Sequence, residues 1–496
     1  MISSTVEKLL NGYDGIELSN EVKTKICSDV CVSIDKIKIN SLFFLTEKVD
    51  EKEKIFDAAS LTVAPLAIVA SASQTVINSS VPIIRAKSVR KALSYALSNS
   101  YGVNYEKVKI IGVTGTNGKT TTATLIYHIL MQCGYKVGFI GTGKIEINGK
   151  LITDSVYSMT TPDSTVLYPA ISEMAYEGCK YIVMEVSSHS IALGKIAPIK
   201  FEYAIFTNLD DDHLDFHKTK DDYFKTKLEL FKSVKCGLFN LDDEYSARAY
   251  NSVSCGKSSF GIINQGDAYA TEIDISDISG SSFYYRESGL IFKAETHLCG
   301  AFNVYNALAA LKCLIDLGIK PCIAKEKLKY IKGIEGRMEI IEDDVTVIID
   351  YAHTPSAFYN SLKTIKQAIK HRQSLFVVFG CGGDRDRNKR AVFGKYAKMY
   401  ASKIILTEDN CRTESFENII ADIAKGIGEG GYEIKKDRES AIRYAIRSAK
   451  QGDVVAVIGK GHEKYKIVGN NYVPFDERKI IEEALNELKE SHASDT

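Results

Sequence analysis

The chain has 496 residues, of which 45% are hydrophobic and 25% are charged, and its 63 basic residues balance its 63 acidic ones. This is the composition of an ordinary globular protein, and at about 150 residues per domain the length predicts roughly three domains. The balanced charge gives no field that would favour nucleic acid or an anionic membrane, and the longest apolar runs are too short to span a bilayer.

Residues 1–106 are predicted to form a small mixed α/β domain. The apolar runs 41–45 and 65–72 suggest strands, and the polar stretch 98–107 suggests a connector. The N-terminus lacks the pattern of a signal peptide. Eleven scattered cysteines, without metal-site spacing, predict reduced thiols. We therefore expect a cytoplasmic protein, without membrane insertion or nucleic-acid binding, and a monomer.

Residues 107–332 alternate between strand and helix patterns. The run 108–114 (VKIIGVT) predicts a strand, 119–131 a helix, and 136–140, 181–186 and 204–206 further strands. Alternation of this kind favours a parallel sheet with helices on both faces.

A glycine-rich loop joins the first of these strands to its helix. It contains Gly115, Thr116, Asn117, Gly118, Lys119, Thr120 and Thr121. Glycines let backbone N–H groups turn toward phosphate oxygens, and the helix N-terminus adds favourable charge. Lys119 can neutralise the β/γ-phosphates and Thr120 can bind Mg²⁺. The loop predicts a P-loop ATPase-like domain, although a glycine-rich turn with an incidental lysine is the alternative.

Two residues at neighbouring strand ends are candidate metal ligands. Glu185 ends one predicted strand, and His213 follows the next. Mg²⁺ prefers oxygen ligands and tolerates an occasional imidazole. Tyr223 and Lys227 lie four residues apart on a predicted helix, 221–231; composition alone makes Lys227 a solvated lysine.

Residues 333–496 also alternate, which predicts a Rossmann-like α/β domain. Strands are predicted at 345–349, 375–379, 403–406 and 454–458, and each is followed by a loop rich in Gly, acidic, Arg or His residues. Open α/β sheets bind ligands at the carboxyl ends of their strands. The four loops therefore predict a binding edge, with ordinary loop chemistry as the alternative.

Together these segments resemble the Mur ligases of cell-wall precursor synthesis. The motifs are GTNGKTT (115–121), TTPDS (160–164), MEVSSHS (184–190), TNLDDDHLDFH (207–217), GAFNVYNALAA (300–310), GRME (336–339), DYAHTP (350–355), GCGGDRDRNKR (380–390), DNCRTE (409–414), GKGHE (459–463) and FDER (475–478). The resemblance covers most of residues 108–485. It implies an ATP-dependent ligase that activates a carboxylate as an acyl phosphate and joins it to an amine.

The resemblance also implies residue roles. Residues 115–121 would hold ATP, with Asn303 and Arg337 near the nucleotide; Thr120, Glu185, His213 and a carboxylated Lys227 would serve the metal. Thr160, Thr161, Ser187 and Lys195 would contact a UDP-muramoyl dipeptide. The incoming amino acid would meet Arg390, Asp409, Asn410, Cys411, Arg412, Gly459 and Glu463.

Arg412 favours meso-2,6-diaminopimelate as that amino acid, because a lysine substrate has no distal carboxylate to meet a guanidinium. Cys411 stands where that branch of the family has Pro, Lys195 where it has Arg, and Met159 where it has Asn. The first domain lacks the usual Asp-Ser-Arg and Pro-Gly-Asp-Leu-Phe. L-lysine addition, a related ligase using another carboxylate, as in folate-type glutamylation, and a regulatory nucleotide-binding module remain alternatives.

Overall fold

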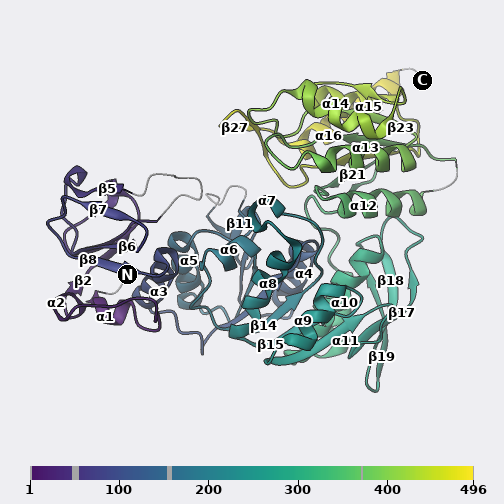
Figure 1. Cartoon of the computed structure of the whole chain (residues 1–496). Helices are drawn as coiled ribbons and strands as arrows, with labels where there is room; N and C mark the ends of the chain where they lie inside the picture. Colours follow the sequence, from purple (N-terminus) through teal and green to yellow (C-terminus); the bar gives the residue numbers. More distant parts are fainter. Residues whose placement is uncertain (1–2, 47–54, 154–158, 370–371, 495–496) are drawn as a thin grey trace.

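The computed structural model describes residues 3–46, 55–153, 159–369 and 372–494, and its main sheets have four, eleven and six strands. They follow one another along the chain. In Figure 1 the N-terminal part lies at one side of the central part, and the C-terminal part lies above it. Helices cover the sheets, so the predicted α/β class is confirmed. Within the described residues no helix is long and apolar enough to cross a membrane, and all eleven cysteines are free.

The N-terminal sheet is parallel, in the order β3-β4-β6-β8. Its strands at 41–44 and 67–71 match the predicted ones. The elements of this part are β1 (Ser4–Thr5), α1 (Val6–Leu9), α2 (Asn20–Lys23), β2 (Ile26–Cys27), β3 (Asp29–Cys31), η1 (Ile34–Lys36), β4 (Ser41–Phe44), β5 (Ile55–Asp57), η2 (Ala58–Ser60), β6 (Ala67–Ser71), β7 (Thr75–Ile77), β8 (Ile83–Ala86) and α3 (Val89–Ser100).

The central sheet has the order β12-β11-β10-β13-β9-β14-β15-β16-β17-β18-β19. Its elements are β9 (Lys109–Thr114), α4 (Lys119–Gln132), β10 (Val137–Gly141), β11 (Lys144–Ile147), β12 (Lys150–Thr153), α5 (Ser164–Tyr176), β13 (Tyr181–Glu185), α6 (Ser188–Ala192), β14 (Phe201–Phe206), α7 (Leu214–His217), α8 (Lys220–Glu229), η3 (Leu230–Ser233), β15 (Val234–Asn240), α9 (Glu244–Ser252), β16 (Gly256–Gly261), β17 (Ala268–Asp274), β18 (Ser281–Glu287), β19 (Leu290–Thr296), α10 (Ala301–Asp316) and α11 (Pro321–Lys329).

The parallel middle of this sheet is buried on both faces. Side chains alternate along a strand, so Ile110 packs into the core that contains α5 and α8, whereas Ile111 packs into the core under α4 and α10. Both isoleucines are fully buried, and each such burial stabilises the fold by about 1.5–3 kcal/mol. Two buried faces explain why these strands read as continuous apolar runs.

The edges of the central sheet differ from the all-parallel prediction. Strands β11 and β12 add to one edge as antiparallel hairpins, and β18 and β19 to the other. The β11–β12 turn is Asn148-Gly149, with both residues at positive φ, a dipeptide that favours tight hairpins. The predicted helix 221–231 also ends earlier, because α8 stops at Glu229 and is followed by the 3₁₀ turn η3.

The C-terminal sheet has the order β20-β21-β25-β22-β23-β24 and is parallel except for β20. All four strands predicted here are present, as β21, β22, β23 and β25. The elements are β20 (Glu339–Ile341), β21 (Thr346–Asp350), α12 (Pro355–Ala368), β22 (Leu375–Phe379), α13 (Asn388–Tyr400), β23 (Lys403–Leu406), α14 (Phe416–Ile427), β24 (Glu433–Ile434), α15 (Arg438–Ser448), β25 (Val454–Ile458), β26 (Tyr465–Val468), β27 (Asn471–Pro474) and α16 (Glu477–Ser494).

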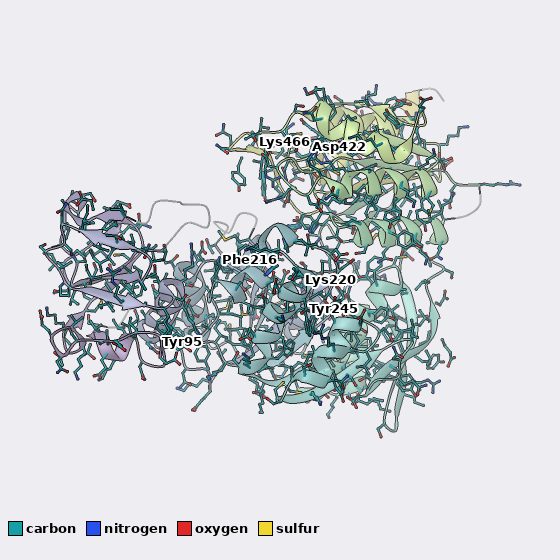
Figure 2. All side chains as sticks on the ribbon, in the orientation of Figure 1. Tyr95, Phe216, Lys220, Tyr245, Asp422 and Lys466 are labelled. Atoms are coloured by element: carbon teal, nitrogen blue, oxygen red, sulfur yellow. The ribbon has the colours of Figure 1, made fainter. Side chains whose placement is uncertain are left out.

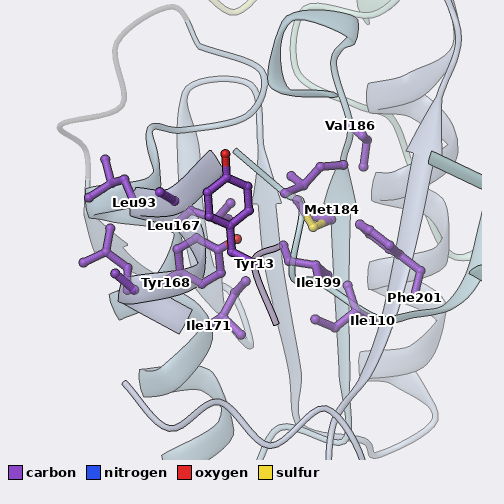
Figure 3. Packing of buried hydrophobic residues seen from close by; sticks show 14 of the residues in the cluster. Tyr13, Leu93, Ile110, Leu167, Tyr168, Ile171, Met184, Val186, Ile199 and Phe201 are labelled. Atoms are coloured by element: carbon purple, nitrogen blue, oxygen red, sulfur yellow. The ribbon is translucent and has the colours of Figure 1, made fainter. Parts of the chain in front are cut away.

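The N-terminal and central parts share one hydrophobic core. Figure 3 shows Tyr13 and Leu93 beside Tyr168 and Met184, which belong to the central part. The hydroxyls of Ser94 and Ser164 also meet at 2.9 Å, between α3 and α5. This continuous packing fixes the N-terminal domain against the face of the central sheet that carries α5.

Candidate active site

The glycine-rich loop lies where predicted, between β9 and α4. Gly115 has a φ of +144°, and a Cβ placed there would lie 1.9 Å from the Thr207 hydroxyl, so only glycine fits. The Asn117 N–H donates to Asn208 Oδ1 (2.9 Å), and Asn208 Nδ2 donates back to the Asn117 carbonyl (3.0 Å). Asn208, which the sequence did not single out, therefore holds the loop in shape from the end of β14.

Lys119 is folded over the same loop. Its Nζ donates to the carbonyls of Gly115 (3.0 Å) and Thr116 (2.7 Å). The side chain is half-buried and stands at the first residue of α4. A cation at a helix N-terminus beside a glycine loop is the arrangement that binds phosphates.

Glu185 ends β13 and is fully buried beside Thr120. Thr120 Oγ1 donates to Glu185 Oε2 (2.8 Å), while the Thr142 N–H (2.9 Å) and hydroxyl (3.1 Å) donate to its two carboxylate oxygens. Thr142 was missed in the sequence, although it directly follows β10, the neighbour of β13. A hydroxyl and a buried carboxylate are the hard oxygen ligands that Mg²⁺ prefers, so this pair fits the implied ion.

Three of the residues expected to contact the first substrate lie around Glu185, at the end of β13. Thr161 Oγ1 donates to the Glu185 carbonyl (2.9 Å) and accepts from the Ser187 N–H (3.0 Å). Thr142 Oγ1 lies 3.4 Å from Thr160 Oγ1. Lys195 instead pairs with Asp163 at 2.5 Å and is largely buried. Thr160, Thr161 and Ser187 are therefore brought together. Lys195 is joined to Asp163, which lies two residues after Thr161.

Lys227 is buried rather than solvated, because α8 turns it under the phosphate loop. Only 1% of it is exposed, and Nζ donates to the Gly115 carbonyl (2.9 Å) and the Thr114 hydroxyl (3.4 Å). It also lies 4.6 Å from the ring centre of Tyr223. Burial, followed by repulsion from Lys119, lowers its pKa well below the usual value. Burial therefore shifts Lys227 toward its neutral, nucleophilic form.

His213 directly precedes α7, in the segment that follows β14. Its backbone is left-handed (φ +54°), and its Nε2 lies 3.4 Å from Asp212 Oδ2. The ring lies edge-on to His189, with centroids 4.9 Å apart. In the part of the chain that the structure describes, no three His, Cys, Asp or Glu side chains form a ready metal cluster. Of the four predicted ligands, only Thr120 and Glu185 are in direct contact.

The C-terminal domain reaches the phosphate loop directly. Arg337 Nη2 donates to Thr120 Oγ1 (3.1 Å), and its guanidinium lies 4.3 Å from the ring centre of Tyr351. Asn117 Nδ2 donates to Ser356 Oγ (3.3 Å). Arg337 was expected near the nucleotide, and the structure places it against the loop. Tyr351 directly follows β21 and Ser356 lies in the first turn of α12; neither was assigned individually.

Asn303 lies in the first turn of α10, buried near the loop. Its Nδ2 donates to the Cys299 carbonyl (2.9 Å), and its Oδ1 accepts from Asn306 (3.0 Å). Asn306 Oδ1 in turn accepts from Thr122 Oγ1 (3.3 Å). The chain of amides connects the start of α10 to the start of α4.

The residues expected to bind the second substrate gather at the carboxyl edge of the C-terminal sheet. Asn410 Nδ2 donates to Glu463 Oε2 (2.8 Å), which joins the loops after β23 and β25. Arg412 Nη1 donates to the carbonyls of Gly383 (2.9 Å) and Asn410 (3.3 Å). A Cβ at Gly459 would lie 2.8 Å from Asp409 Oδ2. Cys411 lies between these residues, and burial raises the pKa of its thiol.

Arg390 is held by groups of the protein itself. It is fully buried, with its guanidinium bound to Glu414 (2.6 and 2.7 Å), to Asp422 (3.1 Å) and to the Gly382 carbonyl (3.2 Å). Asp422 lies on α14 within the C-terminal domain (Figure 2). Through Nη1 and Nη2 Arg390 connects the loop after β22 to Glu414 and to α14, whereas its Nε has no hydrogen-bond partner among the described residues. Its contact with the incoming amino acid stays a prediction.

Arg385 and Arg387 are the exposed arginines of the same segment, and Arg387 is paired with Asp422 at 2.9 Å. A Cβ at Gly382 would lie 3.1 Å from Arg412 Nη1 and 3.6 Å from Arg385 Cγ, so the two arginines flank this glycine. Arg385, Arg387 and Arg390 lie within six residues of sequence, and only the fold shows how the burial and the partners of these side chains differ. Arg385 joins Arg412 as a candidate for recognising an anionic group.

Comparison with known proteins identifies relatives of the whole chain. Residues 113–314 match the family model described as the Mur ligase middle domain, and residues 336–461 match the Mur ligase, glutamate ligase domain. The chain is 37% identical over 475 residues to UDP-N-acetylmuramoyl-L-alanyl-D-glutamate--2,6-diaminopimelate ligase 1 of Clostridium acetobutylicum, covering 93% of this chain and 97% of the relative. It is 36% identical over 482 residues to the ligase of that name in Syntrophomonas wolfei, covering 95% and 97%.

Solved structures resemble the fold over its full length. A UDP-N-acetylmuramoyl-L-alanyl-D-glutamate--2,6-diaminopimelate ligase superposes with a TM-score of 0.68 and 27% identity, over 98% of this chain and 100% of the other. FolC of E. coli, in complex with DHPP and ADP, has a TM-score of 0.59 at 19% identity, over 74% and 89%. The second likeness concerns the fold alone.

Proposed function

The chain belongs to the Mur ligase family, and on this premise we propose that it joins meso-2,6-diaminopimelate to UDP-N-acetylmuramoyl-L-alanyl-D-glutamate in peptidoglycan precursor synthesis. It is an ATP-dependent amide ligase by its family. The observation that carries the choice of amino acid is Arg412, held between the recognition loops after β22 and β23. We place the enzyme in the cytoplasm, because its proposed substrates, ATP and a UDP-linked dipeptide, are found there.

In the first step the acceptor carboxylate attacks the γ-phosphorus of ATP, and ADP leaves. Residues 115–121 hold the phosphates through backbone N–H groups, and Lys119 neutralises charge on the transferring group. Arg337 and Asn303 stand at the loop for the rest of the nucleotide. To reach the phosphate, Lys119 must break its hydrogen bonds to the carbonyls of Gly115 and Thr116. Binding of the phosphate anion favours this change, because it attracts the ammonium.

Mg²⁺, when bound, neutralises phosphate charge and orients the transferring group. Thr120 and Glu185 are the oxygen ligands already in place, and His213 is the third candidate. A carboxylated Lys227 would add a carboxylate-like group under the loop. In this proposal Lys227 serves the ion as a carbamate, because an ammonium would repel it.

In the second step the amine of the incoming amino acid attacks the acyl carbon, an amide forms and phosphate leaves. Thr160, Thr161, Ser187 and Lys195 would hold the muramoyl dipeptide beside Glu185. Glu463, Asn410 and Asp409 would face the charged end of the amino acid, with Arg412 and Arg385 for its distal carboxylate. Contacts between Arg337, Ser356 and the phosphate loop bring the two halves together, which keeps water from the acyl phosphate.

The test supplies ATP, Mg²⁺ and the UDP-muramoyl dipeptide and screens amino acids for ADP formation and product mass. Product with meso-2,6-diaminopimelate, and little with L-lysine, is expected. Equal turnover with L-lysine would contradict the interpretation of Arg412. Turnover only with another carboxylate acceptor would reassign the first substrate and leave the ligase chemistry in place.

Replacing Arg412 by Ala should raise KM for meso-2,6-diaminopimelate by roughly 10–100-fold. Charge-assisted hydrogen bonds contribute about 1.5–3 kcal/mol, and about 1.4 kcal/mol corresponds to tenfold. Steady-state kinetics at saturating ATP and dipeptide measures the effect.

Arg447→Ala is the matched control, because Arg447 is 61% exposed and pairs with Glu487 on α16. It should leave all three KM values unchanged. An Arg412→Ala enzyme with unaltered KM for the amino acid would remove Arg412 from the recognition site.

A further inference from the structure

Lys460 is a buried cation among the recognition loops. It follows β25 in the Gly-Lys-Gly-His-Glu segment, and none of its side chain is exposed. Its Nζ lies 3.2 Å from Asn410 Oδ1, 3.1 Å from Glu463 Oε2 and 3.8 Å from Asp409 Oδ1. Lysine is almost never fully buried unless it is paired, so these contacts define its place.

The carboxamide of Asn410 is fixed at both ends by this arrangement. Its Oδ1 accepts from Lys460 and from the Ile467 N–H (2.9 Å), and its Nδ2 donates to Glu463 (2.8 Å). An ammonium can only donate, so Lys460 requires the oxygen of the amide to face it. The amide NH₂ must then face Glu463, and one orientation of Asn410 is selected.

The same hairpin that meets Asn410 also holds Arg412. The Arg412 N–H donates to the Ile467 carbonyl (3.2 Å), and the Gly469 N–H donates to the Arg412 carbonyl (2.9 Å). Arg412 has a φ of +53°, a conformation that non-glycine residues adopt only when their surroundings impose it. The β26–β27 hairpin therefore links the amide that Lys460 orients to the backbone of Arg412.

We propose that Lys460 is a positioning residue that sets the specificity of the amino-acid site, by orienting Asn410 and Glu463 and, through the β26–β27 hairpin, Arg412. The inference rests on the proposed function and names a residue that supports it. Lys460 is fully enclosed, so it acts on the substrate only through these neighbours. Glu463 keeps 12% of its side chain exposed, so it is the neighbour through which Lys460 acts on the substrate.

Electrostatics supports the same role. Burial alone would raise the pKa of Asp409, but the cations Lys460 and Arg438 outweigh it and hold that pKa below its usual value. Arg438 is itself bound to Glu477 and to the carbonyls of Glu408 and Ile458. Without Lys460, Asp409 and Glu463 would share their buried surroundings with less positive charge, and repulsion would move the two loops apart.

The experiment compares Lys460→Met with the wild type in full-length enzyme, using ATP, Mg²⁺, the UDP-muramoyl dipeptide and either meso-2,6-diaminopimelate or L-lysine. We expect KM for meso-2,6-diaminopimelate to rise on the order of 10-fold, with KM for ATP and dipeptide unchanged. The ratio of kcat/KM between the two amino acids should fall. Lys479→Met, which alters a 75% exposed lysine on α16, is the matched control.

A double-mutant comparison distinguishes a positioning role of Lys460 from a purely stabilising one. Lys460→Met and Asn410→Ala should be clearly less than additive on KM for the amino acid, because both break the same link. A lower melting temperature with unchanged KM and unchanged selectivity would overturn the proposal. If the Met variant fails to fold, Lys460→Arg replaces it in the test, because it keeps the charge. Its KM for the amino acid should still rise, since the donor atoms are displaced. An unchanged KM in the Arg variant would also overturn the proposal.

The two proposals fail in different ways. If the wild type forms no product with any amino acid, the proposed function is wrong. If the wild type is active and discriminates, but the Lys460 variants keep its KM and selectivity, only the positioning role is wrong.

Discussion

Replacing Lys119 by Met should reduce turnover by roughly 10³-fold, because a preorganised charge aimed at the transferring group contributes at about this level. Methionine has a similar length and is apolar, so the loop and α4 should keep their shape. The lost contribution is the cation that now lies on the carbonyls of Gly115 and Thr116. ADP formation at saturating substrates measures the loss, and ATP titration of the same sample measures binding.

Lys136→Met is the control for this prediction. Lys136 lies at the far end of β10 and pairs with Glu177 at the surface, at 2.7 Å. Its replacement should leave kcat within experimental scatter. A Lys119→Met enzyme that turns over at the wild-type rate would show that the loop does not serve phosphoryl transfer.

Replacing Lys227 by Ala should leave the enzyme almost inactive, and a short carboxylate added to the buffer should restore part of the activity. The lowered pKa shifts Lys227 toward its neutral amine, and a neutral amine adds to carbon dioxide with release of one proton. The product is a carbamate anion in place of the amine. Acetate or formate entering the space left by alanine would return a negative charge to the same position.

The sign of the pH dependence follows from the same reaction. Acidification protonates the amine and returns the carbamate to carbon dioxide, so activity that depends on Lys227 should fall as pH falls and rise with added bicarbonate. Carbon-13 NMR after incubation with labelled bicarbonate should show one carbamate signal that the Ala variant lacks. Lys225→Ala is the control, since Lys225 is 65% exposed on the same helix. Full activity of Lys227→Ala would remove the carbamate from the account.

Strands that are buried on both faces could be predicted from the sequence, because their apolar runs are continuous. The strands around Ile110, Val183 and Val457 all lie within predicted ranges. The antiparallel edges could not be predicted in the same way, since half-exposed strands such as β18 mix polar and apolar residues. The Asn148-Gly149 turn was the available signal for one of them.

The phosphate loop could be predicted because its chemistry is contained in seven consecutive residues. Contacts across the sequence could not: Thr142 reaches Glu185 only because β10 and β13 are neighbours. Burial also decided roles that composition leaves open. Lys227, which composition alone makes a solvated lysine, is enclosed; Arg390 is buried and paired with carboxylates, and Arg385 is exposed.

The most direct test of the account follows an oxygen atom. The UDP-muramoyl dipeptide is prepared with oxygen-18 in the carboxylate that accepts the amino acid, and a single turnover is run with ATP, Mg²⁺ and meso-2,6-diaminopimelate. If residues 115–121 seat ATP so that this carboxylate attacks its γ-phosphorus, the released phosphate carries one labelled oxygen. Unlabelled phosphate together with amide product would contradict the acyl phosphate, and with it the role given to the loop.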